Sequence, residues 1–362
     1  MPTCLIALLL VLLNACAGAP RIPDTPEAPP EHGAFERVLR MDPITLNSPP
    51  DGIRNWGPAE FFEAGNDAYD DADWRTAVAW YDRIIHEYPE HELVPSALFN
   101  GGLALEQLND LGRAEAYFAA IVDRASESEL VASALWNLVE LREKRAAWSD
   151  VLQTIAQFHD LDLSDDERFE LEARAWIARA ILKPTDANID RLEAIAATFQ
   201  ERLRRGAQLG RDTLARLYWT VGEIWLGRAQ AVIPDPDSRH LEDDLETKAA
   251  ALLRAQDAYL RTVRALDPVW ATAAVFRIGF AYESFYADLI NSPAPSALSE
   301  DERTVYLEEV YKTLAPVKKK AEMAYERIIR FSRQYSIMSD WVHQAEERLS
   351  RLQALELPSP GG

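Results

Sequence analysis

Cysteine is nearly absent from this 362-residue sequence, which contains only Cys4 and Cys16, both at the N-terminus. The body of the chain therefore holds no disulfide framework and no cysteine-based metal site. Lys and Arg are missing from residues 1 to 4, although secretory signals usually begin with positive charge. The apolar run from Leu5 to Leu13 is too short to cross a bilayer as a helix, and it predicts a signal peptide that is removed.

Motifs that carry enzyme chemistry are also missing. The sequence contains no Gly-rich phosphate loop, no Gly-x-Ser-x-Gly elbow and no cysteine nucleophile with a partner histidine. Acidic residues are so frequent that no pair of carboxylates stands out for glycoside hydrolysis. The six histidines are scattered without ligand spacing: His32, His86, His91, His159, His240 and His343. We therefore predict a protein that is not an enzyme and has no metal and no cofactor.

One acidic run invites comparison with a calcium loop. It lacks the glycine and the distal glutamate of an EF-hand. Its members are Asp67, Asp70, Asp71 and Asp73. We predict instead that these side chains cap and solvate a turn between two helices.

Positive charge is scarce overall, because 38 Lys and Arg residues face 59 Asp and Glu residues and the formal net charge is -21. Such a surface repels nucleic acid and anionic lipid. The excess fits a solubilising coat on helices or, as an alternative, a basic partner. The hydrophobic content of 48% is that of a globular protein with one large domain or two ordinary ones.

The segment Leu13-Asn14-Ala15-Cys16 resembles the lipobox of bacterial lipoproteins. The resemblance implies that the Cys16 thiol is lipidated, that cleavage makes Cys16 the first mature residue, and that acyl chains attach the protein to a membrane. Ala17 follows the cysteine, which in the known lipoprotein sorting rule implies the outer membrane, facing the periplasm. The alternative is an ordinary signal peptide cleaved near Ala15 to Ala19, which yields a soluble secreted protein.

The remaining chain divides by composition. We predict a signal peptide at 1–15, a proline-rich extended tether at 16–57, a helical body at 58–355 and a disordered tail at 356–362. The tether and its boundary contain Pro20, Pro23, Pro26, Pro29, Pro30, Pro43, Pro49, Pro50 and Pro58. After Pro58, apolar residues recur at spacings of three and four, and no alternating β-branched run occurs. The body is predicted to be all-α.

Two stretches of the body share a pattern of small and large residues at a distance of 37 residues. Gly65, Ala77, Tyr81 and Pro89 define the first stretch, and Gly102, Ala114 and Phe118 define the second. A small residue at a helix crossing, with a large one on the facing helix, lets two helices interlock. The pattern resembles the tetratricopeptide (TPR) repeat, which implies a right-handed α-solenoid of helix hairpins.

The pattern weakens and then returns with insertions. The third unit keeps apolar residues at Val139, Val151 and Ile155 but loses the small ones, and a fourth helix pair is expected at 165–182 and 187–205. Two further units are split, and a final helix pair at 318–355 caps the stack. The split units contain Gly222, Ala255 and Tyr259, then Gly279, Ala321 and Tyr325. Their insertions, 234–248 and 292–316, begin as loops and gather on one face, where they lengthen helices or form a lip.

The TPR resemblance also indicates a binding groove. Several TPR domains grip a peptide carboxylate with Lys and Arg and hold its backbone with Asn, but the first Lys position here is Phe62, so the charge clamp is missing. A peptide is then expected to bind by apolar contact and amide hydrogen bonds. The predicted groove consists of Phe62, Asn66, Tyr69, Phe99, Asn100, Leu103 and Asn137. The alternative is that the asparagines only solvate a concave helix face.

These features predict a lipid-anchored scaffold that binds envelope proteins. Similar combinations of anchor, tether and TPR body occur in lipoproteins of β-barrel assembly, of Tol-Pal coordination and of gliding motility. The alternative is an outer-membrane lipoprotein that binds nutrient glycans on a TPR-like framework, although the two insertions are small for such a lobe. A cell-wall lytic enzyme requires a further domain for which the chain has no room.

Overall fold

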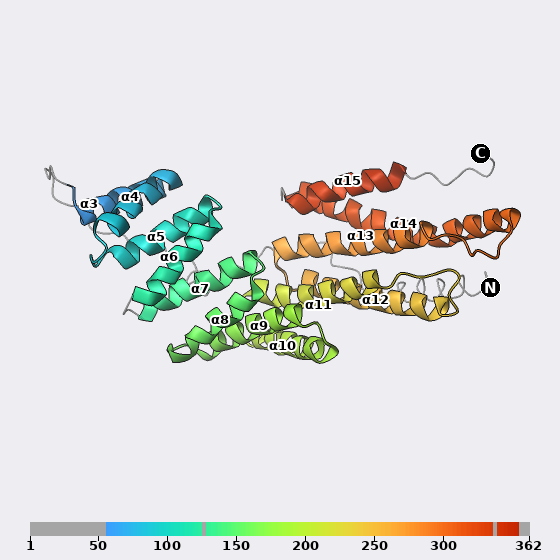
Figure 1. The fold of residues 1–362 in the computed structure, drawn as a ribbon, viewed down its shortest axis with the longest axis horizontal. Helices are drawn as coiled ribbons and strands as arrows, with labels where there is room; N and C mark the ends of the chain where they lie inside the picture. The colour runs from blue at the N-terminus through green and yellow to red at the C-terminus, as the bar shows by residue number, and fades with distance from the viewer. Residues whose placement is uncertain (1–55, 125–127, 336–338, 355–362) are drawn as a thin grey trace. The chain divides into compact units, whose positions relative to one another are not determined.

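The computed structural model describes residues 56–124, 128–335 and 339–354. The predicted signal peptide, Cys16, nearly all of the predicted tether and the C-terminal tail lie outside these residues. Within them, the chain is all-α, with thirteen α-helices, one short 3-10 helix and no strand (Figure 1). The all-α prediction is confirmed.

The chain forms two compact units. Among the described residues, the N-terminal unit extends to Lys183 and includes Arg205–Gly210, and the C-terminal unit contains Pro184–Arg204 and the chain from Arg211 onward. The N-terminal helices are α3 (Pro58–Asp70), α4 (Trp74–Glu87), α5 (Val94–Gln107), α6 (Leu111–Arg124), α7 (Ser128–Lys144), α8 (Trp148–Ala156), η1 (Gln157–Asp160) and α9 (Asp165–Leu182). The C-terminal helices are α10 (Asp186–Arg204), α11 (Arg211–Ala231), α12 (Leu241–Arg264), α13 (Pro268–Ile290), α14 (Glu300–Tyr335) and α15 (Asp340–Ala354).

The turns of the N-terminal unit repeat at an interval of 37 residues. Ala72, Asn109 and Ala146 have φ values of 57°, 58° and 55° and join α3 to α4, α5 to α6 and α7 to α8. In each turn the next residue donates its backbone N–H to a carbonyl five residues back, as Asp73 does to Ala68 at 2.8 Å. The third unit thus keeps the turn of the first two although its sequence lacks their glycine. Successive helices pack against each other as a stack of hairpins.

Side chains in the first of these turns explain the acidic run. The Asp73 carboxylate accepts a hydrogen bond from the backbone N–H of Thr76 at 3.3 Å and caps the N-terminus of α4. This hydrogen bond to Thr76 lowers the pKa of Asp73 below its usual value. The predicted capping role is confirmed for Asp73.

The cores of the first two hairpins are built on the predicted contact of a glycine with a ring. A Cβ on Gly65 would lie 2.6 Å from Cε1 of Tyr81, and one on Gly102 would lie 2.7 Å from Cζ of Phe118. Ala77 and both rings have no exposed surface. The helices approach closely because the glycines leave room for the rings. Ala114, the other predicted small residue, is also fully buried. Pro89 follows α4, and its backbone carbonyl accepts a hydrogen bond from Arg124 at 3.5 Å.

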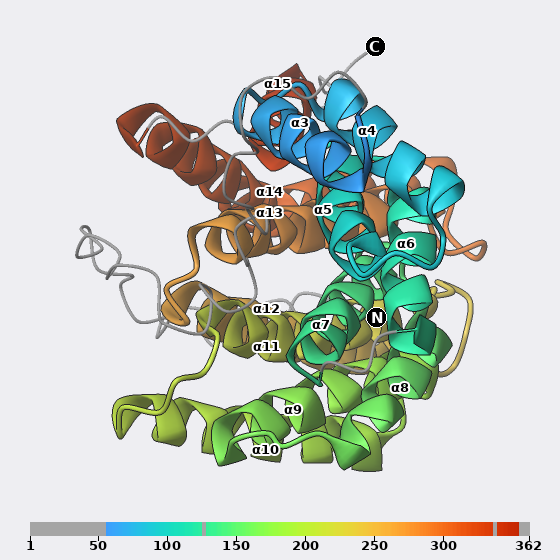
Figure 2. The same cartoon turned by 90° about the vertical axis from the view of Figure 1, so that its left-hand side faces the viewer.

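The C-terminal unit repeats this contact with longer helices. Cβ atoms on Gly222 and Gly279 would lie 2.6 and 2.7 Å from Cε1 of Tyr259 and Tyr325, across the α11–α12 and α13–α14 pairs. Both views show the order α10, α11 with α12, α13 with α14, and α15 within this unit (Figures 1 and 2).

The two insertions mainly lengthen helices. The first becomes a short loop and the opening turns of α12, and the second becomes a loop and the opening turns of α14, a 36-residue helix that continues through Pro316. The loops meet where the backbone N–H of Ser296 donates to Asp237 at 2.8 Å. Inside, the ammonium of Lys248 bonds the carbonyls of Ala229 and Val232 at 2.9 and 3.0 Å and so satisfies the C-terminus of α11.

Candidate interaction surface

The predicted peptide groove is largely filled by the protein itself. Phe62, Phe99 and Asn100 have no exposed surface, and Asn66 and Asn137 expose only 4% and 6%. These five side chains are therefore unavailable to a ligand in this conformation. The other two members of the predicted set, Tyr69 and Leu103, are half-buried. Tyr69 packs edge-on against Trp74 with ring centroids 4.8 Å apart.

The buried asparagines instead connect neighbouring helices. The Asn66 carbonyl on α3 accepts hydrogen bonds from the Tyr81 hydroxyl on α4 at 2.7 Å and from Nδ2 of Asn100 on α5 at 3.0 Å. Nδ2 of Asn137 donates to the carbonyl of Ser133, one turn earlier, at 2.8 Å. Burial raises the pKa of Tyr81 far above its usual value, so the hydroxyl stays a donor. These buried amide side chains thus find their hydrogen-bond partners inside the protein.

The same three-way contact recurs with charged groups in the C-terminal unit. Glu223 on α11 accepts a 2.5 Å hydrogen bond from the Tyr259 hydroxyl on α12 and a two-pronged contact from Arg277 on α13. Glu283 on α13 accepts from the Tyr325 hydroxyl on α14 at 2.5 Å and from Arg348 on α15 at 3.1 Å. Each acceptor thus connects its own hairpin to the next one.

These contacts escaped the sequence analysis. A signal was present, because a tyrosine stands in the ring position of three hairpins and a phenylalanine, Phe118, in the fourth. Asn66 and Glu223 directly follow the glycine of their hairpins, whereas the residue after Gly102 is Leu103, which has no acceptor. A tyrosine in the ring position therefore indicates a polar acceptor on the facing helix.

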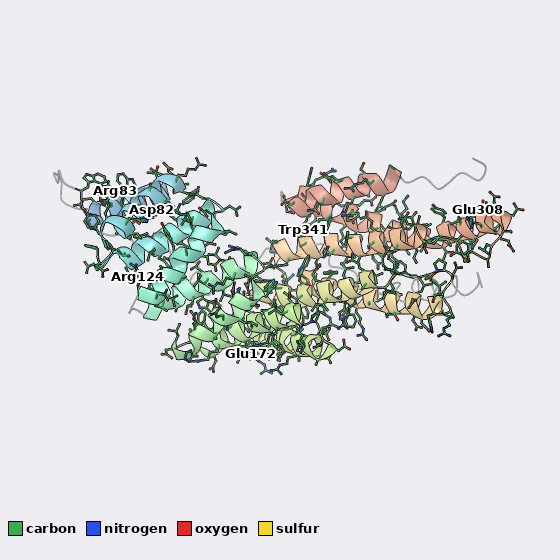
Figure 3. The ribbon with its side chains drawn as sticks, in the orientation of Figure 1. Asp82, Arg83, Arg124, Glu172, Glu308 and Trp341 are labelled. Carbon is green, nitrogen blue, oxygen red and sulfur yellow. The ribbon has the colours of Figure 1, made fainter. Side chains whose placement is uncertain are left out.

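The arginines of these contacts belong to a larger surface on α11, α13 and α15. We call it the aromatic-arginine face, and it consists of Arg216, Trp219, Trp270, Arg277, Phe280, Trp341 and Arg348, all half-buried. Helix α13 packs against both α11 and α15, so the three helices form one continuous face. Figure 3 shows Trp341 at the start of α15, beside α13. Glu308, near the start of α14, lies at the other end of this unit in the same view.

Rings and guanidinium groups alternate across this face. The Trp219 ring lies 5.3 Å from that of Trp270 and 6.2 Å from that of Trp341. The Phe280 ring has the guanidinium carbon of Arg277 at 5.2 Å and that of Arg348 at 4.7 Å. Such contacts between cations and rings hold long side chains in place. Trp and Arg are also the residues that carry most binding energy in protein interfaces.

Two exposed apolar residues at the turn between α12 and α13 come shortly before Trp270 in the sequence, and we call them the apolar edge. Leu266 is 52% exposed and Val269 is 69% exposed, and Val269 directly precedes Trp270. Leu266 also has a φ of 64°, a left-handed conformation that is strained for leucine. The guanidinium carbon of Arg216 lies 6.0 Å from the Trp270 ring. The edge and the face together present apolar and cationic groups to solvent.

The N-terminal unit contains a buried charge cluster of a different kind. Arg174 on α9 donates to Glu143 on α7 at 2.7 Å and lies 3.5 Å from Glu170, and all three side chains are at least 95% buried. Glu170 also accepts from the backbone N–H of Gly210 at 3.2 Å. The cluster joins α7, α9 and residues 205–210. Its depth suits a structural role.

The part of the chain that the structure describes contains no group of three or more His, Cys, Asp or Glu side chains arranged to hold a metal ion. None of its helices combines the length and the apolar character needed to cross a membrane.

Comparisons with known proteins add little beyond the helices themselves. No protein-family model matches the chain, and no curated protein matches it. Among solved structures, it is similar to a TPR repeats protein from Bacteroides fragilis, with 14% identity, a TM-score of 0.28 and coverage of 82% of this chain and 98% of that one. The TM-score is too low for that similarity to support an argument. The fold is defined by the chain's own structure, as two all-α units of stacked helix hairpins.

Proposed function

We propose that this chain is a non-enzymatic scaffold of the bacterial envelope, which binds other envelope proteins through its stacked helix hairpins. The observation that carries the proposal is the aromatic-arginine face. Stacked hairpins create extended surfaces for partners, and this face combines half-buried Trp rings with arginines held in fixed positions. Side chains that are already ordered lose little conformational entropy on binding.

Co-purification tests this proposal against the alternative of glycan binding. The full chain is expressed with an affinity tag in its own envelope, solubilised in detergent and isolated. Recovery of one or a few envelope proteins in fixed ratio supports the scaffold. If no protein is recovered and the isolated chain binds oligosaccharides saturably, the glycan-binding alternative is the better account.

Attachment to a membrane is the second part of the proposal. We propose that acyl chains on Cys16 hold the protein in the outer membrane, facing the periplasm, and that residues 16–57 connect this anchor to the helical body. The support is the sequence around Cys16 and the proline-rich composition that follows it. Replacement Cys16→Ser is expected to move the protein from the membrane to the soluble fraction and to remove the mass of the lipid. An unchanged membrane fraction would contradict the anchor.

A further inference from the structure

A cleft lies in the C-terminal unit where the loop before α12 meets the loop before α14 (Figure 1). Both loops and three helices line it, and it has a volume of about 340 Å³, open solvent at its mouth included. Most of the lining is apolar, including Leu241 and Leu245 on α12, Leu289 on α13 and Val310 on α14. We call it the loop cleft. Its volume is at the lower end of the range of about 300–1,000 Å³ for ligand pockets, which suits one large side chain.

The walls of the loop cleft are held in place by the protein itself. Pro234 and Pro236 in the lining restrict the backbone of the first loop. The Asp237 carboxylate accepts a hydrogen bond from the backbone N–H of Ser296 at 2.8 Å and so joins the two loops. Lys248 donates to the backbone at the start of the first loop at 3.0 Å. A ligand therefore meets a cleft that is already ordered, and little conformational entropy is lost on binding.

Two hydroxyl groups also line the cleft, on Ser292 and Tyr306. Neither has a hydrogen-bond partner among the residues that the structure describes. The hydroxyls of Tyr259 and Tyr325 in the same unit, by contrast, are both bonded to carboxylates. An apolar cavity with a few polar groups is the usual composition of a binding site. The two hydroxyls are suited to hydrogen bonds with the backbone of a bound peptide.

Acidic residues predominate in the chain segments that contain the two loops. Residues 233–247 and 292–306 include nine Asp and Glu residues but only two Lys and Arg residues, Arg239 and Arg303. Lys248, the buried cation nearby, is paired with Asp288 at 2.7 Å and adds no net charge. The surroundings of the cleft are therefore strongly negative.

Three of these carboxylates stand next to the lining. Glu242 and Asp244 are adjacent along α12 to the lining leucines, and Glu302 precedes Tyr306 by one turn of α14. Glu302 caps α14 by accepting hydrogen bonds from Ser299, and these bonds lower the pKa of Glu302. The capping carboxylate thus keeps its negative charge at neutral pH. We call Glu242, Asp244 and Glu302 the acidic rim.

The sign of this charge decides between kinds of occupant. The alkyl chain of an anionic lipid would suit the apolar lining, but its head group would then lie among carboxylates, which repel it. Nucleic acid is repelled for the same reason. A protein segment that carries Lys or Arg on both sides of an apolar side chain matches the lining and the rim together.

We infer that the loop cleft binds a segment of a partner protein in which one large apolar side chain is flanked by Lys or Arg. This inference rests on the proposed scaffold function and adds a binding surface and the chemistry of its partner. The apolar side chain contacts Leu241, Leu289 and Val310. The basic residues pair with the acidic rim, and the hydroxyls of Ser292 and Tyr306 bond to the backbone of the segment.

Three synthetic peptides test this chemistry on the chain from residue 17 onward, which keeps every described helix and needs no detergent. The first has nine residues, with a central Phe between two pairs of Lys. The second has Ser in place of Phe, and the third has Glu in place of every Lys. Fluorescence anisotropy is expected to show saturable binding of the first and about tenfold weaker binding of the other two. Equal binding of all three, or no binding of the first, would overturn the inference.

The variant Ser292→Phe fills the cleft from inside. Affinity for the Phe-Lys peptide is expected to fall at least fivefold, with little change in melting temperature. Ser296→Phe is the matched control, because Ser296 lies in the same loop but is exposed and outside the lining. It is expected to leave the affinity unchanged. The same affinity in both variants would contradict the assignment of the cleft.

A second pair of variants tests the acidic rim without changing the shape of the cleft. Glu242→Gln/Asp244→Asn is expected to weaken binding of the Phe-Lys peptide at least threefold. Asp301→Asn/Glu308→Gln is the control: both residues are exposed, and the helical period places them on the other side of α14 from Tyr306. Equal losses in the two double variants would show that overall charge, and not the rim, attracts the peptide.

Failure of this inference is distinguishable from failure of the scaffold function. If native envelope proteins co-purify with Ser292→Phe in the same amount as with the wild type, the scaffold stands and the cleft is the wrong surface. If the wild-type chain recovers no protein although the Phe-Lys peptide binds, the scaffold function fails and the chemistry of the cleft stands. If octyl glucoside binds in the cleft and none of the peptides does, the cleft takes alkyl chains, and a protein partner there is overturned.

Discussion

Gly222 and Tyr259 fit together across the α11–α12 pair so closely that a Cβ on the glycine would lie 2.6 Å from Cε1 of the ring. Three other hairpins contain the same contact, so it is the common packing unit of both parts of the chain. The ring lies over the glycine, and the tyrosine hydroxyl reaches Glu223, the residue that follows the glycine. One contact thus sets the spacing of a hairpin, and its hydroxyl connects that hairpin to the next.

Gly222→Ala tests this packing unit. The added methyl group has to displace the fully buried Tyr259 ring, and overpacking of this kind costs about 1–3 kcal/mol. Urea unfolding of the full chain measures the loss. Gly227→Ala on the same helix is the control: a Cβ there meets no atom within 4 Å, so the free energy of unfolding is expected to rise by about 0.5–1 kcal/mol. Equal effects at the two glycines would contradict the packing account.

Ala72→Gly is expected to stabilise the first hairpin. Alanine at a φ of 57° is strained by roughly 1–2 kcal/mol, and glycine adopts this conformation without strain, so the net gain after the entropy of glycine is about 0.5–1 kcal/mol. Ala79→Gly, at an exposed position inside α4, provides the opposite control and is expected to destabilise by about 1 kcal/mol. A loss of stability in Ala72→Gly would show that the turn geometry is wrong.

Arg174→Met probes the buried charge cluster. The variant leaves the carboxylates of Glu143 and Glu170 without the arginine that they share, and breaking a buried pair in this way costs about 3–5 kcal/mol. The triple variant with Glu143→Leu and Glu170→Gln removes both stranded charges and is expected to recover most of that loss in thermal unfolding. If the triple variant is no more stable than the single one, the arginine matters for its packing and not for its charge.

Alkaline pH is expected to unfold the protein through its buried tyrosines. Burial raises the pKa values of Tyr81, Tyr259 and Tyr325 far above the value of about 10 that tyrosine has in an unfolded chain. The unfolded state therefore loses these protons first, and each tyrosine lowers stability by about 1.4 kcal/mol per pH unit above pH 10. Below pH 10 their contribution is complete.

The variant Tyr259→Phe checks this pH dependence. It lacks one of these titrating groups, so its stability is expected to fall less steeply above pH 10 than that of the wild type. At neutral pH it is expected to be less stable, because Glu223 loses a hydrogen bond that typically contributes about 1.5–3 kcal/mol. An unchanged slope would contradict the role of burial.

The repeat could be predicted from sequence because its spacing has a direct steric cause. Gly65 with Tyr81 and Gly102 with Phe118 recur at 37 residues, and only a small residue leaves space for the facing ring. In the C-terminal unit an insertion separates Gly222 from Tyr259 in the sequence. The pair could still be recognised, because Ala255 precedes Tyr259 by four residues, as Ala77 precedes Tyr81. The third unit was harder, since its shared feature is the backbone turn at Ala146, which has no sequence signature of its own.

The candidate site was less predictable than the fold. Groove residues were transferred from positions in other TPR domains, but whether such a position faces solvent depends on the next hairpin. Asn66 and Asn100 form a hydrogen bond because their helices lie side by side. The sequence around either residue does not reveal that the two helices are neighbours. The aromatic-arginine face combines α11, α13 and α15, which are separated in sequence by long helices. The tryptophans occur at helix-packing positions, so the sequence does not distinguish those that are buried from those that stay half-exposed.

Site-specific photo-cross-linking tests most directly whether the aromatic-arginine face and the apolar edge bind a protein partner. A benzophenone amino acid is placed at Val269, in the apolar edge, or at Glu308, an exposed position near the start of α14 (Figure 3). After irradiation of intact cells, the account predicts covalent adducts with one or a few envelope proteins from position 269 and few or none from position 308. Adducts of equal yield and identity from both positions, or none from position 269, would contradict it.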